Sequence, residues 1–157
     1  MTPNQLPSDG VAILATLDPA SVGVSTVVTA WVPVQNFHSF LAIINTGVLG
    51  AAATLDAKLR QAQDAAGTGA KDIAGKALVQ IVKATGDTKQ AMINARASDL
   101  DQANGFGWIA LSVTIAAAAS LFSALLLGFY PRFEPVKDAA ASPAINLGSA
   151  NVVQIIP

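Results

Sequence analysis

Apolar and polar residues alternate most regularly over residues 108–115. One set of alternate positions is apolar: Ile109, Leu111, Val113 and Ile115. The other set holds mostly small or polar side chains: Trp108, Ala110, Ser112 and Thr114. A period of two places successive side chains on opposite sides of a strand, as in a sheet that packs against a second layer. We therefore predict a strand here, in a two-layer protein.

Shorter segments of β-type character lie on both sides of it, separated by turn residues. Strands are predicted over residues 26–34, 38–46, 54–60, 77–83, 92–97 and 121–130, with a shorter one over 11–14. Residues 54–60 also fit a helix, since Leu55 and Leu59 stand four positions apart. The alternation of Leu55, Ala57 and Leu59 favours the strand. About seven or eight strands at this spacing predict an all-β fold, an antiparallel β-sandwich or jelly roll.

The uncharged run from Gln102 to Pro131 allows a second interpretation. As a helix, residues 106–130 would be long enough to cross a bilayer, which takes about 20 apolar residues. Ala116–Ala119 favours a helix because alanine is a strong helix former. The β-branched residues within 109–115, and the glycines at positions 105, 107 and 128, favour two strands instead. We favour the strands and keep a small membrane protein with one span over 106–130 as the alternative.

The composition indicates a chain that needs a partner surface. Charged residues make up 12% of its 157 residues, about half of the usual share of roughly 25%. The net charge of −1 gives no attraction to nucleic acid or to an anionic membrane surface. The chain lacks cysteine, and its first 20 residues lack the basic segment of a signal peptide. We therefore expect assembly in a reducing cytoplasm.

Two arms flank the predicted β-domain over residues 26–135. Residues 1–25 and 136–157 mix Pro, Gly, Ser and Ala with short apolar stretches, so both are predicted to be extended. Apolar termini are unusual on a monomer. The arms are therefore predicted either to be disordered ends or to pair with neighbouring subunits as added strands. The predicted interface residues are Val11, Ile13, Leu14, Phe133, Ile145, Leu147, Val152, Val153, Ile155 and Ile156.

No group of residues predicts catalysis, a cofactor or a metal ion. His38 is the single histidine, whereas a zinc site needs three or four ligands. Residues 67–71, Gly-Thr-Gly-Ala-Lys, lack the spacing of a phosphate-binding loop and predict a glycine turn. Asp99 and Asp101 form an acidic pair without the rest of a calcium loop. We therefore expect that the protein is not an enzyme.

A longer pattern runs from Phe37 to Pro135. It comprises FHSFLAIINTGVLGAAATLDAKLRQAQDAAGTGAKDIAGKALVQI, then INARASDLD, then GFGWIALSVTIAAAASLFSALLLGFYPRFEP. In these stretches the chain resembles the small β-sandwich head proteins of tailed bacteriophages and gene transfer agents. The resemblance implies a decoration, cement or spike-base protein that sits as an oligomer on the capsid shell. It also implies a strand over residues 54–60 and no enzymatic site.

The leading hypothesis from the sequence is therefore a structural virion protein at the capsid surface. Its expected partners are the major capsid protein and copies of itself, as a trimer or a pentamer, and neither nucleic acid nor membrane. Besides the membrane protein, a carbohydrate-binding β-sandwich module remains an alternative. That function needs exposed aromatic side chains, whereas Trp31 and Trp108 are expected to pack in the core.

Overall fold

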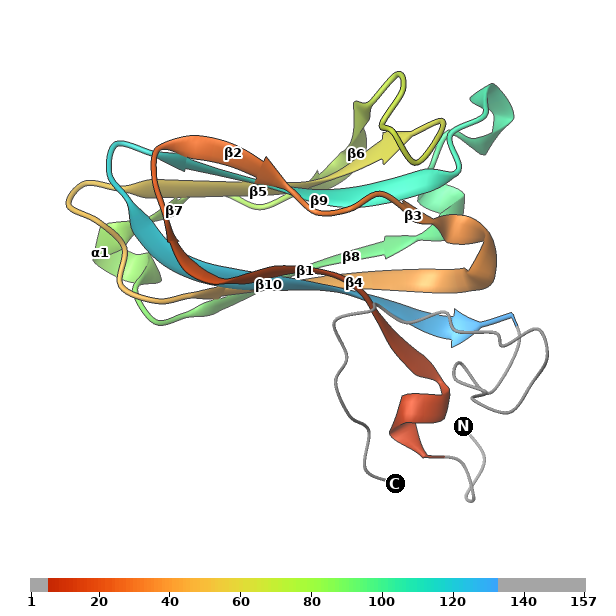
Figure 1. Ribbon diagram of the computed structural model, residues 1–157, viewed down its shortest axis with the longest axis horizontal. Helices are drawn as coiled ribbons and strands as arrows, with labels where there is room; N and C mark the ends of the chain where they lie inside the picture. The colour runs from red at the N-terminus through yellow and green to blue at the C-terminus, as the bar shows by residue number, and fades with distance from the viewer. Residues whose placement is uncertain (1–5, 133–157) are drawn as a thin grey trace.

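Two antiparallel sheets pack face to face in the computed structural model, which describes residues 6–132 (Figure 1). The predicted all-β sandwich is confirmed. Helical structure in the described part is limited to single turns: η1 (Pro7–Asp9), η2 (Val34–Asn36), α1 (Lys83–Gly86), η3 (Ala97–Asp99) and η4 (Gln102–Asn104).

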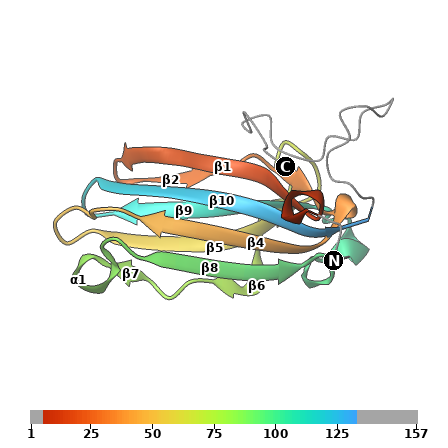
Figure 2. The ribbon, with the colours of Figure 1, turned by 90° about the horizontal axis from the view of Figure 1, so that it is seen from below.

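The four-stranded sheet has the order β1-β10-β4-β8, and Figure 2 shows these strands side by side. They are β1 (Val11–Val22), β10 (Ser120–Pro131), β4 (Phe37–Thr46) and β8 (Gln90–Arg96). β10 pairs with β1 on one side and with β4 on the other, so the first and last described strands are direct neighbours.

The second sheet is formed around β9. Its main strands are β2 (Ser25–Val28), β9 (Trp108–Ala116), β5 (Thr54–Ala62) and β6 (Lys71–Ala77), in that order. β3 (Val32–Pro33) also pairs with β9, and β7 (Ile81–Val82) also pairs with β5. β1 lies in one sheet and β2 in the other, so the chain crosses between the layers at Gly23 and Val24.

The core fills the space between the two sheets. From β4 and β10 it receives Phe40, Ala42, Ile44, Phe122, Ala124 and Leu126; from β5 and β9 it receives Leu55, Ala57, Leu59, Ile109, Leu111, Val113 and Ile115. The core residues of β5 and β9 are the alternate positions that the sequence predicted for 54–60 and 108–115. The Phe37 and Phe40 rings meet edge to face, with centroids 6.3 Å apart, the geometry that aromatic pairs prefer.

The uncharged run forms two strands, β9 and β10, as favoured from the sequence, so the alternative with a membrane span over 106–130 is wrong. Ala117 turns the chain between them with φ = 69°, which ends the alternation at the alanine run. None of the helices within residues 6–132 has the length and apolar character that crossing a membrane requires.

Two other predictions need correction. The N-terminal arm over residues 1–25 is wrong for residues 11–22, which form β1 in full pairing contact with β10. Register shifts at Ile13/Ala15 and Leu17/Ala20 interrupt the alternation there, and Pro19 adds to the break. The strand predicted over 77–83 is divided among the end of β6, the two residues of β7 and the start of α1. The predicted tail over 136–157 lies outside the described residues.

Candidate functional site

The outward faces of the two sheets differ in chemistry. On the six-stranded sheet, Lys58 and Arg60 both reach Asp72, with nitrogen–oxygen distances of 2.7 and 3.2 Å. The hydroxyls of Thr26 and Thr114 lie 2.8 Å apart across β2 and β9. This face carries the polar groups that normally meet water on one side of an antiparallel sheet.

The outward face of the four-stranded sheet carries many large apolar residues instead, beside uncharged polar ones such as Ser39, Asn45 and Ser123. The strand pairing identifies the outward positions, because two residues that lie opposite each other in paired strands point to the same side of the sheet. We call this surface the apolar face and define it by Val11, Ile13, Leu41, Ile43, Met92, Leu121, Leu125, Leu127 and Phe129. Figure 2 is viewed onto this side of the sheet.

Charge is confined to the margins of the apolar face. Its two central strands, β10 and β4, contain no Lys, Arg, Asp or Glu. Met92 on β8 is 61% exposed and Leu121 on β10 is 44% exposed, although both are large apolar side chains. Soluble monomers rarely expose a contiguous apolar patch of more than a few hundred Å². The apolar face therefore has the chemistry of a contact surface.

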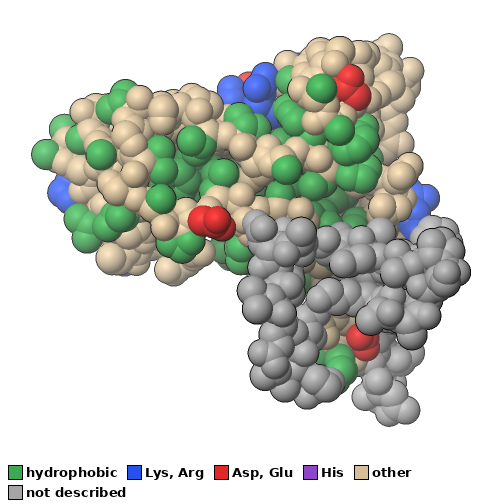
Figure 3. Space-filling model, in the orientation of Figure 1, with side chains coloured by type: hydrophobic (Ala, Val, Ile, Leu, Met, Phe, Trp, Pro, Cys, Tyr) green, Lys and Arg blue, Asp and Glu red, His purple; other side chains and the backbone are tan. Residues whose placement is uncertain are grey.

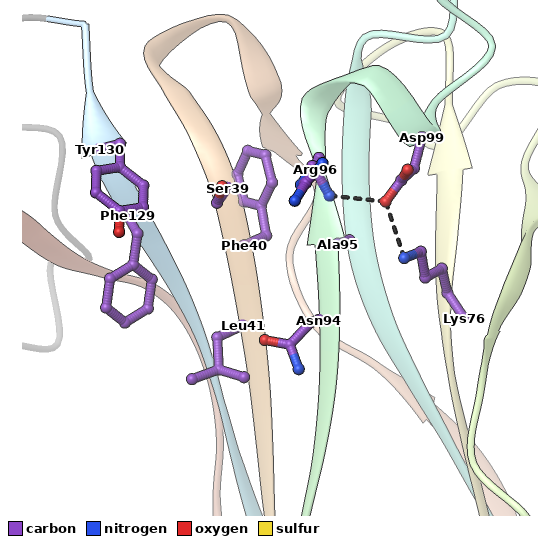
Figure 4. A pocket seen from close by; sticks show the side chains of 10 residues that line it. All are labelled: Ser39, Phe40, Leu41, Lys76, Asn94, Ala95, Arg96, Asp99, Phe129 and Tyr130. Carbon is purple, nitrogen blue, oxygen red and sulfur yellow. Dashed lines mark hydrogen bonds and ion pairs between the residues drawn. The ribbon is translucent and has the colours of Figure 1, made fainter.

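A depression of about 690 Å³ lies at one end of this face (Figure 4). Phe129 and Tyr130 come from β10, Ser39 from β4, and Asn94 and Arg96 from β8. Tyr130 is 70% exposed and has φ = 52°. A left-handed backbone is an outlier for a bulky residue, and here it occurs directly before a proline, which favours extended backbone. Strain of this kind often occurs at functional sites.

Asp99 anchors the polar side of the depression. Its carboxylate accepts a hydrogen bond from the Arg96 backbone N–H at 2.8 Å and lies 2.9 Å from the Lys76 ammonium. These two contacts, the backbone one first, hold the pKa of Asp99 below its usual value. The Arg96 guanidinium makes no hydrogen bond within residues 6–132. Its positive charge also helps to lower the pKa of Asp99, so a cation and an anion both lie beside the apolar face.

The predicted interface residues fall into three groups. Val11 and Ile13 lie on the apolar face, opposite Phe129 and Leu127 of β10. Leu14 packs against the core instead, because the register shift after Ile13 turns it inward. The remaining predicted residues lie outside the described part of the chain: Phe133, Ile145, Leu147, Val152, Val153, Ile155 and Ile156. The alternate leucines of β10 were not predicted as contact residues, because an almost wholly apolar strand resembles one that is buried on both faces.

The other candidate residues have ordinary structural roles. His38 is exposed on β4. Asp64 accepts hydrogen bonds from the Ala66 and Thr68 backbone at 2.9 and 3.0 Å, which forms the predicted turn. Asp99 and Asp101 pair with different lysines. Between residues 6 and 132, no three His, Cys, Asp or Glu side chains gather as a metal site would need.

No protein-family model and no curated protein matches the chain. Solved structures with a similar arrangement include the SPBc2 prophage-derived protein YomS, at 9% identity and a TM-score of 0.44 over 75% of this chain and 93% of that one. The Yersinia pseudotuberculosis-derived mitogen has 10% identity and a TM-score of 0.41 over 77% and 86% of the two chains. A chain of the cowpea mosaic virus top component has 14% identity and a TM-score of 0.36 over 80% and 86%. Each TM-score lies below 0.5, so none of these likenesses bears on what the chain does.

Proposed function

We propose that the chain is a structural virion protein, a decoration or cement protein that docks on the capsid shell of a tailed bacteriophage or gene transfer agent. The observation that carries the proposal is the apolar face, whose two central strands hold no Lys, Arg, Asp or Glu. The sequence resemblance from Phe37 to Pro135 supports this role.

A sheet face suits a protein partner better than a small ligand. Small-molecule sites are concave and enclose most of the ligand, whereas the leucines of β10 stand side by side along a strand. Burying such a surface stabilises a complex by roughly 25 cal/mol per Å² before the cost of ordering is subtracted. A stable interface covers about 800 Å² per partner. The major capsid protein would supply the matching apolar surface.

The depression would give the docked protein a fixed orientation. Tyrosine and arginine are the residue types that most often dominate the energy of an interface. Tyr130 and Arg96 stand at one end of the apolar face, beside Phe129. The Arg96 guanidinium would pair with a carboxylate of the shell, while the leucines of β10 would supply the apolar contact.

Purified particles of the virus that encodes this chain provide the test. We expect mass spectrometry to find the chain on intact particles in a fixed ratio to the capsid protein. Particles that lack the chain should bind the added wild-type protein, and they should bind Met92→Lys and Leu127→Lys at least tenfold more weakly. Gln80→Lys is the control. It adds the same charge at an exposed residue whose side-chain amide donates to Asp56 of the six-stranded sheet. This variant should bind like the wild type. Absence of the chain from particles, or equal binding by all variants, would overturn the proposal.

Carbohydrate binding is a second candidate, favoured by Tyr130. Its exposed ring, with Phe129, Asn94 and Arg96 around the depression, could stack on a sugar and hydrogen-bond its hydroxyls. Trp31 and Trp108, which were expected in the core, are half-buried. A glycan array probed with the wild type and Tyr130→Ala tests this function. Binding that Tyr130→Ala abolishes would support it, and an array without binding would exclude these glycans.

A further inference from the structure

The edge of the four-stranded sheet at β8 lacks the protection that the other sheet edges of the described part have. Natural edges are usually short, charged, bulged or covered. In the six-stranded sheet, β2 has four residues, β3 and β7 have two each, and β6 carries two lysines and an aspartate. Figure 3 shows the side of the sandwich along which β1 runs, and β1 is interrupted by two register shifts and carries Asp18 and Pro19. β8 has seven residues in unbroken register with β4, and its charge is limited to Arg96 at its end.

The backbone groups of β8 that point away from β4 belong to alternate residues. In an antiparallel pair, residues that exchange hydrogen bonds with the neighbouring strand alternate with residues whose N–H and C=O groups point the other way. The Thr46 backbone N–H of β4 donates to the Lys89 carbonyl at 2.9 Å. By alternation, the odd-numbered residues of β8 bond to β4 and the even-numbered ones face away. Gln90, Met92 and Asn94 therefore direct their N–H and C=O groups to the edge of the sheet.

Arg96 supports this alternation at the end of the strand. Its backbone N–H donates to the Asp99 carboxylate at 2.8 Å, although Ser39 of β4 lies opposite it (Figure 4). Asp99 thereby covers the last outward donor of β8. Within residues 6–132, β4 is the one strand that pairs with β8. The outward groups of Gln90, Met92 and Asn94 are therefore available to an added strand.

This edge is complementary to a second copy of itself. Under a two-fold axis at Met92, β8 of one copy runs antiparallel to β8 of the other. Met92 then lies opposite Met92 of the second copy, and Gln90 lies opposite Asn94. Residues opposite each other at such positions exchange both of their hydrogen bonds, so all the outward groups of these three residues are paired. A two-fold dimer requires this kind of self-complementary patch.

The same register keeps like charges apart and covers apolar side chains. Each Arg96 lies four positions from Met92, which separates the two cations by roughly 27 Å along the paired strands. Met92 is 61% exposed, and Val79 in the connection from β6 to β7 is 92% exposed. Figure 2 shows β8, β6 and β7 along one side of the sandwich. A contact on this side would therefore remove exposed apolar surface as well as pair the backbone.

We propose that two copies of the chain form a dimer in which β8 pairs with β8 across a two-fold axis at Met92. The two four-stranded sheets would join into one continuous sheet, and the apolar faces of both copies would lie side by side on it. Main-chain hydrogen bonds would set the register, as they do wherever a strand is added to a sheet edge. The inference names the contact between copies and does not rest on the capsid role.

The absence of cysteine allows a test of the register. A disulfide needs Cα atoms about 4.4–6.8 Å apart, and opposite residues that exchange hydrogen bonds lie about 5.5 Å apart. Under mild oxidation, Met92→Cys should therefore give disulfide-linked dimers. Gln90→Cys and Asn94→Cys should each give at least tenfold less product alone, whereas a mixture of the two should link one chain of each kind. Leu121→Cys, exposed on β10, is the control and should stay unlinked.

Proline at position 94 tests the hydrogen bonds between copies. The Asn94 N–H points away from β4, and strands tolerate proline where the missing donor faces outward. Asn94→Pro should keep the circular dichroism spectrum of the wild type. Native mass spectrometry should show dimers for the wild type and monomers for this variant.

A second proline variant is the matched control. Ala51 is exposed in a turn that the Ala53 N–H closes on the Gly50 carbonyl at 3.1 Å, with φ = 56° at Ala52. Proline is common at the position before such a residue, so Ala51→Pro should remain dimeric.

Three results would overturn the inference. They are a wild type that is monomeric or that forms trimers or pentamers, dimers that persist in Asn94→Pro, and equal disulfide yields for Met92→Cys and Leu121→Cys. The disulfide yields decide the matter if Asn94→Pro fails to fold. Binding to particles is measured separately, so the loss of this contact would leave the proposed function standing.

Discussion

Gly128 of β10 provides a sharp test of how the core is packed. It lies opposite Phe40 of β4 and Ala12 of β1, in the middle of the four-stranded sheet. A Cβ at this position would lie 2.8 Å from two carbons of the Phe37 ring and 2.9 Å from the Leu14 Cδ1 atom. The Phe37 side chain is only 1% exposed, so it has no room to move away. Gly128→Ala is therefore expected to destabilise the fold.

The magnitude follows from two opposing effects. Overpacking a core typically costs about 1–3 kcal/mol, while replacing a strand glycine by alanine gains roughly 0.5–1 kcal/mol where the side chain fits. We expect a net loss of about 1–2 kcal/mol, which corresponds to a fall in Tm of roughly 3–8 °C for a domain of this size. Urea unfolding followed by circular dichroism measures the free energy directly.

Two matched glycines separate the steric effect from the change of residue type. A Cβ at Gly23 or Gly107 meets nothing within 4 Å, so Gly23→Ala and Gly107→Ala should be neutral or slightly stabilising. Phe37→Leu added to Gly128→Ala should recover part of the loss, which a double-mutant cycle detects as coupling. If Gly128→Ala unfolds at the same urea concentration as Gly23→Ala, the packing described for Phe37 is wrong.

The remaining predictions concern charge and local order. Hydrogen bonds and neighbouring cations, above all Lys58 for Asp72 and the Arg96 backbone for Asp99, lower the pKa of both carboxyls from 3.8 in the folded protein. The stability that these two carboxylates contribute to the fold is present above their pKa in the unfolded chain. It is lost as the pH falls below about 4. The urea concentration at which the wild type unfolds should therefore fall between pH 5 and pH 2.5. It should fall less for the double variant Asp72→Asn/Asp99→Asn. An equal fall in both proteins would contradict this explanation. Asp87 accepts from the Leu49 backbone N–H at 2.9 Å, and Asp87→Ala should speed hydrogen exchange at that amide while a distant β9 amide stays unchanged.

The strands that the sequence predicted best are those with one clear apolar side. Residues 54–60 and 108–115 alternate without interruption, and both are strands with the predicted inward residues. β6 was missed because Gly75, with φ = 72°, breaks its pattern. In the partner strand β5, the register shifts between Lys58 and Arg60, which a single sequence does not reveal.

The candidate site was harder to predict than the fold. The sequence placed the contact residues in the two arms, whereas the apolar face is formed mainly by the domain itself. Leu125 and Leu127 were included in a predicted strand, but which side of an almost wholly apolar strand faces outward depends on its neighbours. The pairing of Leu127 with both Ile13 and Leu41 settles this, and these contacts join residues that are far apart in the chain.

The position of β10 between β1 and β4 has a consequence for synthesis in the cell. β1 obtains its strand partner only when β10 has been made, about 100 residues later. At about 5–20 residues per second, the ribosome needs roughly 5–20 s for this stretch. During that time the apolar first strand of the nascent chain lacks its β10 partner, so the four-stranded sheet closes only after β10 has been synthesised. A chaperone that binds the nascent first strand should therefore raise the yield of folded protein, and slower synthesis should lower it when no chaperone is present.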